Sequence, residues 1–150
     1  MMKNLLKICL FSILIISCGY SPMYSKKNIG DFSIQRIVLE GDFEINQFIR
    51  NRLKGYINGD DKNGFLVEAN SDYQKRSITK DATGNTTKYE IFIKTNFLIK
   101  SKNDVKDFAI TEVFIMKSFD NKFEEAQYEK TIKNNLSSLI ADQLMVKLQN

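Results

Sequence analysis

Apolar residues recur along this chain with two alternating spacings, and these spacings predict its secondary structure. Positions 32–39 are rich in apolar and β-branched residues, and their alternation slips by one place near Arg36. The slip predicts a strand with a bulge or with burial on both faces. From Asp42 the apolar residues fall three and four apart, as on one face of a helix that Asp42 can cap and Gly59 can close. The expected core face of this helix consists of Ile45, Phe48, Ile49, Leu53, Tyr56 and Ile57.

A long extended hairpin is predicted after the polar loop at 60–64. Residues 81–85 form its turn, in which Gly84 can adopt a positive φ without steric cost. Two strands of about 15 residues would each reach roughly 50 Å, whereas the first helix would reach about 23 Å. Because 71–80 is mostly polar, we expect the tip to overhang whatever the helices cover. In the first strand Phe65, Val67, Ala69 and Tyr73 share one parity. In the return strand one face carries Tyr89, Ile91, Ile93, Phe97 and Ile99.

The chain ends with a fourth strand and a second helix. The strand spans about 105–119, and its centre at 108–116 is apolar at both parities except at Thr111 and Glu112. Either an enclosing partner covers this strand, or it is a central strand with a bulge near Glu112. The helix spans about 123–148 and leaves Lys133 and Asn134 exposed. Its apolar face consists of Tyr128, Ile132, Leu136, Leu139, Ile140, Leu144 and Leu148.

The N-terminal segment has the layout of a secretion signal. Lys3 and Lys7 precede an apolar stretch at 8–16 that is interrupted only by Ser12 and is too short to span a bilayer. The sequence Ile-Ile-Ser-Cys at 15–18 resembles the processing site of a bacterial lipoprotein. We therefore expect a signal peptide at 1–17, lipid attachment at Cys18 and a lipidated tether at 18–31. An ordinary secretion signal with an incidental cysteine, or an uncleaved anchor, are the alternatives.

Composition narrows the class of partner. Loss of 17 residues, Lys3 and Lys7 among them, leaves 133 residues with 20 basic and 18 acidic side chains, a net charge of +2. This near balance argues against nucleic acid as the main partner. The only other cysteine, Cys9, departs with the signal peptide, so the mature chain can form no internal disulfide.

Few residues could perform catalysis. The chain contains no histidine, which removes the commonest general base and the Ser-His and Cys-His nucleophile systems. It has no phosphate-binding glycine loop. The carboxylate pairs Asp60-Asp61 and Glu124-Glu125 fit a solvated loop and a helix start. We therefore expect neither an enzyme nor a resident cofactor or metal.

Two motifs resemble the LPS-assembly lipoproteins of the LptE family. They are Cys-Gly-Tyr-Ser-Pro-Met-Tyr at 18–24, immediately at the processing point, and Lys-Asp-Ala-Thr-Gly-Asn-Thr-Thr-Lys-Tyr-Glu at 80–90, in the hairpin. The resemblance implies an α+β fold over residues 32–150, in the order β-α-β-β-β-α. In that fold a four-stranded, mostly antiparallel sheet carries two helices packed on one face. Gly19 also lacks the acidic character that retains lipoproteins in the inner membrane, which implies a periplasm-facing position on the outer membrane.

The resemblance further implies a role without catalysis. Such lipoproteins plug the LptD β-barrel translocon, assist its assembly and contact lipopolysaccharide. Lipopolysaccharide carries phosphates, and Lys75, Arg76, Lys80 and Lys88 cluster near the hairpin turn, where cations could meet phosphate oxygens. The alternatives are solvated surface charge for these residues, and a scaffold or pilotin-like assembly factor for another complex as the function.

Overall fold

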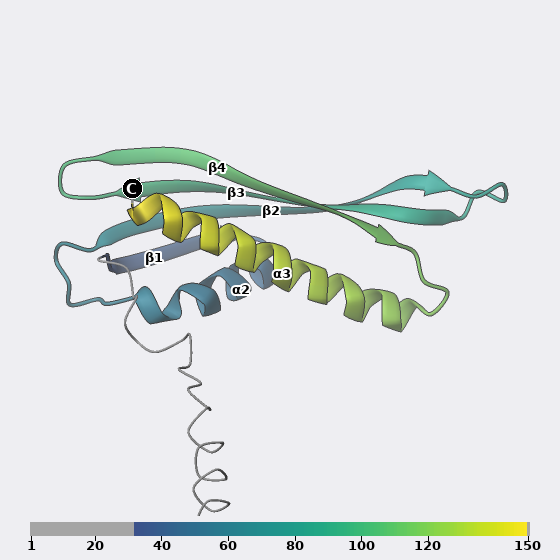
Figure 1. Ribbon diagram of the computed structural model, residues 1–150, viewed down its shortest axis with the longest axis horizontal. Coiled ribbons are helices and arrows are strands. Elements are labelled where there is room, and N and C mark those ends of the chain that lie inside the picture. The colour runs from purple at the N-terminus through teal and green to yellow at the C-terminus, as the bar shows by residue number, and fades with distance from the viewer. Residues whose placement is uncertain (1–31, 150) are drawn as a thin grey trace, which may run out of the picture.

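The computed structural model describes residues 32–149 and shows a sheet with both helices on one side (Figure 1). The signal peptide, Cys18 and the tether lie outside the described residues. The predicted order is confirmed, with a short 3-10 helix added after the first α-helix. The elements are β1 (Ile34–Gly41), α2 (Phe43–Leu53), η1 (Lys54–Tyr56), β2 (Phe65–Lys80), β3 (Thr86–Lys100), β4 (Val105–Lys117) and α3 (Lys122–Gln149).

The four strands lie in the order β1-β2-β3-β4. The β1–β2 pair is parallel, joined through α2, and the other two pairs are antiparallel, so the expected mostly antiparallel sheet is confirmed. The register of β1 shifts between Ile34 and Arg36, where the sequence alternation slips. The pairing of β4 with β3 is regular throughout. β4 is thus an edge strand without a bulge, and its interpretation as a bulged central strand is wrong.

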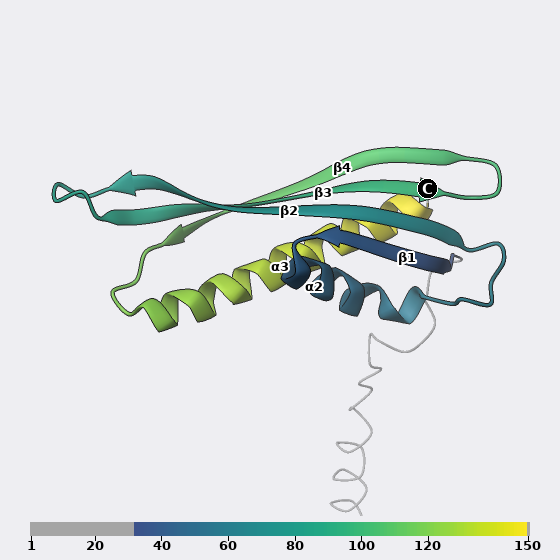
Figure 2. The ribbon, with the colours of Figure 1, turned by 180° about the vertical axis from the view of Figure 1, so that it is seen from behind.

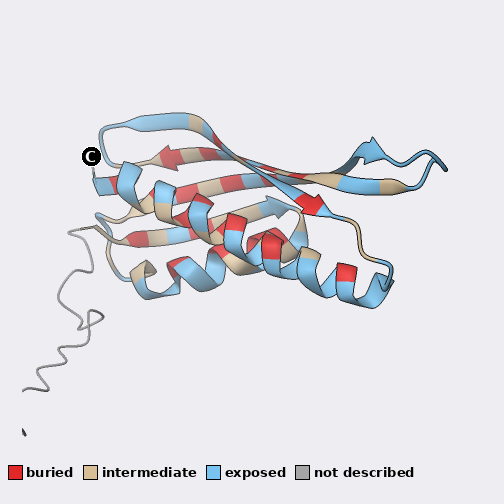
Figure 3. Ribbon diagram, turned by 45° about the vertical axis from the view of Figure 1, so that its right-hand side comes forward, coloured by how far each residue is buried: buried red, intermediate tan, exposed pale blue. Residues whose placement is uncertain are grey.

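The core lies between the sheet and the helices (Figure 3). Odd-numbered residues of β2 and β3 face the helices, and the buried ones include Ser71 and Thr95, whose hydroxyl oxygens lie 3.1 Å apart. The two helices contribute one buried stripe each. Together these stripes contain Ile45, Ile49, Leu53, Ile132, Leu136, Ile140, Ala141, Leu144 and Leu148.

Three predictions about the faces of α3 are wrong. Tyr128, expected on the apolar face, is 40% exposed, and its ring centre lies 5.4 Å from that of Phe119. Leu139 is 48% exposed, because the stripe of α3 that meets the sheet passes through its neighbours Leu136 and Ile140 instead. Lys133 is not exposed: its side chain keeps 14% of its accessible surface, and its Nζ lies 2.9 Å from a carboxylate oxygen of Glu44 on α2. The aliphatic part of a lysine can pack against apolar neighbours while its ammonium binds a carboxylate.

The passage from β1 into α2 depends on a glycine that the sequence did not single out. Gly41 has φ +88°, and an added Cβ there would lie 2.1 Å from the carbonyl oxygen of Ser71. Asp42 caps the helix as predicted, since its Oδ1 accepts a hydrogen bond from the Ile45 amide at 2.9 Å. The helix ends at Leu53 and passes into η1, and Gly59 does not have a positive φ, so its predicted closing role is wrong.

Within residues 32–149, neither helix has the length and apolar character needed to cross a membrane.

Candidate functional site

One face of the sheet carries no helix. This open face is formed by the even-numbered residues of β1 after its register shift, those of β2 and β3, and the odd-numbered residues of β4. Both helices lie on the other side of the sheet (Figures 1 and 2). Phe92, Val113 and Ile115 gather on it, and the last two are each 48% exposed. No other described segment covers this apolar group, so it is available to a partner.

The β2–β3 hairpin extends past the rest of the sheet (Figure 1). β1 pairs with β2 only as far as Ser71, and β4 pairs with β3 only from Lys88 onward. Beyond these points the two strands pair with each other alone, through two register shifts between Ser77 and Lys80. The expectation of an overhanging tip is therefore confirmed, and its side chains are mostly exposed (Figure 3).

The turn at the tip is held by one carboxylate. Asp81 Oδ1 accepts hydrogen bonds from the amide of Thr83 at 2.9 Å, its hydroxyl at 2.6 Å, and the amide of Asn85 at 2.9 Å. The hydrogen bonds from Thr83 and Asn85 hold the pKa of Asp81 below its usual range. Gly84 takes φ +90°, as predicted. The tip thus presents its neighbouring side chains from a defined turn.

Three of the four predicted cations are exposed on the hairpin, and the structure adds a fifth residue to the group. Arg76, Lys80 and Lys88 are exposed, and Lys88 lies directly opposite Lys117 at the end of β4. Like charges directly opposite each other in a sheet are destabilising unless something neutralises them. Sequence reasoning missed Lys117, although the β3–β4 turn at 102–104 places the end of β4 beside the start of β3.

These cations differ in what already surrounds them. Arg76 donates from Nε to Gln74 at 3.0 Å, lies 3.8 Å from a Glu90 carboxylate oxygen and has its guanidinium 5.5 Å from the ring centre of Phe92. The side-chain ammonium groups of Lys80, Lys88 and Lys117 form no hydrogen bond or ion pair with any of residues 32–149. Among the cations of the hairpin, these three lysines are therefore the ones most available to an anionic ligand.

Lys75 lies apart from the other predicted cations because it points toward α3. Its Nζ donates to Glu125 Oε1 at 3.1 Å and to Glu129 Oε2 at 2.8 Å, and it lies 4.2 Å from the ring centre of Tyr89. The Tyr73 hydroxyl donates to Glu129 Oε1 at 2.5 Å. We call Tyr73, Lys75, Glu125 and Glu129 the ionic clamp, since they fasten β2 to the first turns of α3.

Glu125 is the buried centre of the clamp, with 5% of its surface exposed, so the expectation of a solvated helix-start acid is wrong. Burial alone would raise the pKa of Glu125. Hydrogen bonds from the Phe119 amide, Lys122, Lys75 and Ser118 outweigh it and lower that pKa to about 2. Burial likewise opposes charge on Lys75 and Glu129, but their mutual contacts raise the pKa of Lys75 and lower that of Glu129.

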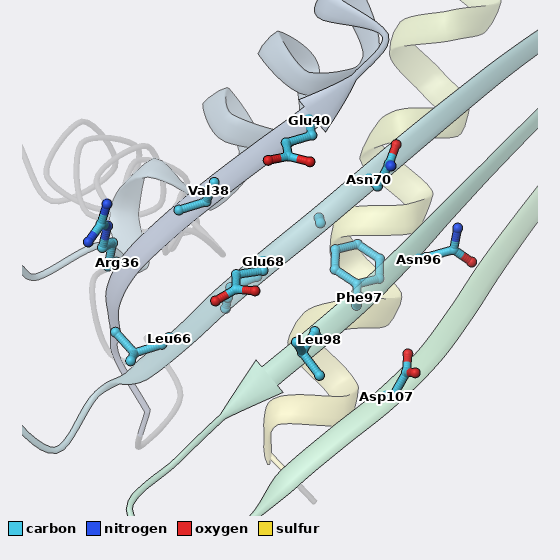
Figure 4. Close-up of a pocket in the computed structure, with 12 residues that line it drawn as sticks. Arg36, Val38, Glu40, Leu66, Glu68, Asn70, Asn96, Phe97, Leu98 and Asp107 are labelled. Carbon is cyan, nitrogen blue, oxygen red and sulfur yellow. The ribbon is translucent and has the colours of Figure 1, made fainter.

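A shallow groove of about 480 Å³ lies on the open face at the end away from the tip (Figure 4). Leu66, Leu98 and Val38 supply its apolar lining. Glu68, which binds Lys100 at 2.6 Å, lies among them, and the remaining polar side chains stand around the edge. The open face therefore offers a partner two contact regions, the groove at one end and the apolar group near Val113 closer to the tip.

The fold is shared with solved structures of bacterial lipoproteins. At the level of sequence, no protein-family model and no curated protein matches the chain. The chain is similar to the rare lipoprotein B from Shewanella oneidensis, with a TM-score of 0.60 at 13% identity over 75% of this chain and 92% of that one.

Two further solved structures of lipoproteins are similar to this chain. Lipoprotein B from Nitrosomonas europaea gives a TM-score of 0.59 at 12% identity, over 79% of this chain and 84% of that chain. A minor lipoprotein from Acinetobacter baumannii gives 0.52 at 12% identity, over 75% and 94%. The TM-scores show that residues 32–149 have the fold of these lipoproteins. At 12 to 13% identity, the similarity is one of architecture alone.

Proposed function

We propose that the protein is an outer-membrane lipoprotein that plugs and helps to assemble an LptD-type β-barrel and contacts lipopolysaccharide. The observation that carries the proposal is the open face together with the overhanging hairpin. A sheet with one uncovered face, an edge strand whose outer side is unpaired and a projecting pair of strands has surfaces that an enclosing barrel would cover. The motifs at 18–24 and 80–90 and the shared lipoprotein fold support the same function.

Contact with lipopolysaccharide is proposed for the exposed cations of the hairpin. Lys80, Lys88 and Lys117 offer ammonium groups that no described carboxylate neutralises, and Arg76 lies on the same open face as Lys88. Phosphate oxygens accept charge-assisted hydrogen bonds from such groups. Lys75 takes part as well, by fixing the base of the hairpin on α3.

The barrel part of the proposal is tested by extracting the lipid-anchored protein in detergent and identifying what remains bound. We expect a β-barrel of the LptD type in the purified complex. A stable complex with a different pore, or with a soluble periplasmic scaffold, would support the assembly-factor alternative instead. Recovery of the protein alone under conditions that preserve outer-membrane complexes would contradict both.

The lipid part is tested by charge reversal. Changing Arg76, Lys80 and Lys88 together to Glu should weaken lipopolysaccharide binding, with a larger defect at low salt, where the Debye length is longer. The thermal melt should shift only slightly, because these side chains are exposed.

A matched control carries the same change in net charge at Arg50, Lys54 and Lys62, which are also exposed but lie away from the hairpin. We expect the control to bind lipopolysaccharide as the unmodified protein does. Equal losses in the two triple variants would mean that net charge, and not the hairpin, governs binding.

A further inference from the structure

The two edges of the sheet differ in how they are protected against pairing. β1 is eight residues long, is bulged between Ile34 and Arg36, and ends at the positive-φ Gly41. Short length and bulges are common means of blocking an edge. β4 is 13 residues long and pairs regularly with β3, and no described strand lies on its outer side. Its outer edge is therefore open to a further strand.

The backbone of β4 shows which residues would pair. In an antiparallel ladder the residues alternate between those that bond to the partner strand and those whose amide and carbonyl groups point away from it. The Ser118 amide donates to the Thr87 carbonyl at 2.9 Å, and the Ser101 amide donates to the Asp104 carbonyl at 2.9 Å. Both bonds show that the even-numbered residues of β4 direct their amide and carbonyl groups toward β3. The odd-numbered residues, Val113 and Ile115 among them, thus direct their amides and carbonyls outward.

The side chains beside this edge are apolar on both faces of the sheet. Val113 and Ile115 lie on the open face and are each 48% exposed, and Phe114 lies on the helix face and is 37% exposed. The run 113–116 contains no charge. Outward backbone groups with apolar side chains on either side form the usual receptor for an added β-strand.

Charge at the end of the edge restricts the occupant. Lys117 follows the apolar run and faces Lys88 across the sheet, so an incoming strand that carries an acid beside Lys117 would neutralise the pair. A second copy of β4, paired antiparallel about a twofold axis within 113–116, would set Lys117 opposite Ala109, Thr111, Val113 or Ile115. None of these residues is acidic. A twofold axis at Glu112 would set Lys117 opposite Asp107, but it would also set Glu112 opposite the Glu112 of the second copy. Like charges directly opposite each other are destabilising, which disfavours a second copy in that register as well.

We propose that the outer edge of β4 receives an extended segment of a partner protein as a fifth strand. That segment has apolar residues opposite Val113–Ile115 and an acidic residue beside Lys117. The inference rests on the proposed function only for the identity of the partner, which is then the barrel or one of its loops.

The experiment uses the full-length protein in its own membrane. A photoreactive benzoylphenylalanine replaces Val113, and in a matched variant it replaces Val38, which lies on the open face of the opposite edge strand. We expect the Val113 variant to cross-link to one protein, at an extended, acid-containing segment located by mass spectrometry, and the Val38 variant not to reach that segment. A cross-link to a second copy, or none at Val113, would overturn the inference.

Backbone pairing is tested separately from side-chain contact. Val113→Pro removes an outward amide without removing a bond to β3, whereas Val113→Thr keeps the amide and the β-branched shape. The Pro variant should capture the partner about tenfold less than the Thr variant, as expected for one lost hydrogen bond and a clash with the ring. Equal capture would refute strand addition. If the Pro variant does not fold, the cross-linking experiment at Val113 decides whether a strand is added: a cross-link to an extended, acid-containing segment supports strand addition, and no such cross-link refutes it.

The two experiments distinguish failure of strand addition at β4 from failure of the proposed function. If an LptD-type barrel co-purifies but Val113 cross-links to nothing, the edge inference fails and the proposed function stands. If Val113 cross-links to an acidic strand of an unrelated protein, the edge inference stands and the proposed function fails.

Discussion

The single change Glu125→Gln tests whether the charge of the buried carboxylate in the ionic clamp stabilises the fold. Glutamine keeps the size of the side chain and one carbonyl oxygen that can accept from the Phe119 amide, but it removes the charge that binds Lys75 and Lys122. Lys75 keeps Glu129 as a partner, so the change isolates the buried carboxylate.

The expected magnitude follows from the pKa of Glu125. That pKa falls from the reference value of 4.5 to about 2 in the folded protein, and each unit corresponds to about 1.4 kcal/mol. Because the folded pKa lies below the unfolded one, the carboxylate stabilises the fold fully above pH 4.5 and loses this effect as the pH falls toward 2. We therefore expect Glu125→Gln to cost about 3 kcal/mol at pH 7 and less than half of that at pH 3.

The assay is urea unfolding followed by circular dichroism, with the free energy of unfolding measured between pH 3 and pH 7. The control is Glu124→Gln, since Glu124 is the exposed neighbour and accepts from the Asn121 side chain at 3.2 Å. It should cost under about 0.5 kcal/mol at every pH. A cost for Glu125→Gln that stays below about 1 kcal/mol, or that does not change with pH, would refute the clamp as a charged, buried contact.

Three other changes test separate parts of the molecule. Leu144→Ala should cost about 2 to 5 kcal/mol in the same assay, because Leu144 is fully buried, whereas Leu139→Ala should cost little. Lys133→Ala should cost about 1 to 2 kcal/mol, against almost nothing for Asn134→Ala, since Lys133 binds Glu44 and lies 4.0 Å from the ring centre of Tyr73. Cys18→Ser should abolish acyl labelling and release the protein from the membrane or leave it unprocessed; full labelling in that variant would contradict lipid attachment there.

The order of elements was predictable because period two and period 3.6 are properties of the backbone alone. The slip near Arg36 became a real register shift, and the turn around Gly84 took the expected positive φ. Both features are local, since each depends only on the conformations open to a few consecutive residues. The overhang was predictable for a related reason, because strand and helix lengths follow from fixed rises per residue.

The features that were not predicted all depend on which elements meet. α3 is 28 residues long, and its buried stripe is defined by two different neighbours, α2 and the sheet. That arrangement leaves Leu139 in solvent and brings Lys133 between Glu44 and Tyr73. Glu125 could be assigned to a helix start from sequence, but its burial requires β2 to pass beside that start.

Strand geometry divides the predicted group of cations into two roles. Lys75 and Arg76 are adjacent, so their side chains leave β2 on opposite faces. Lys75 meets the carboxylates of α3, which fixes the base of the hairpin, and Arg76 stands on the open face with Lys88. The same register sets Lys88 beside Lys117, at the end of the free edge of β4. A contact made by β2 with the helix thus determines where the cations lie relative to the edge that we expect a partner strand to occupy.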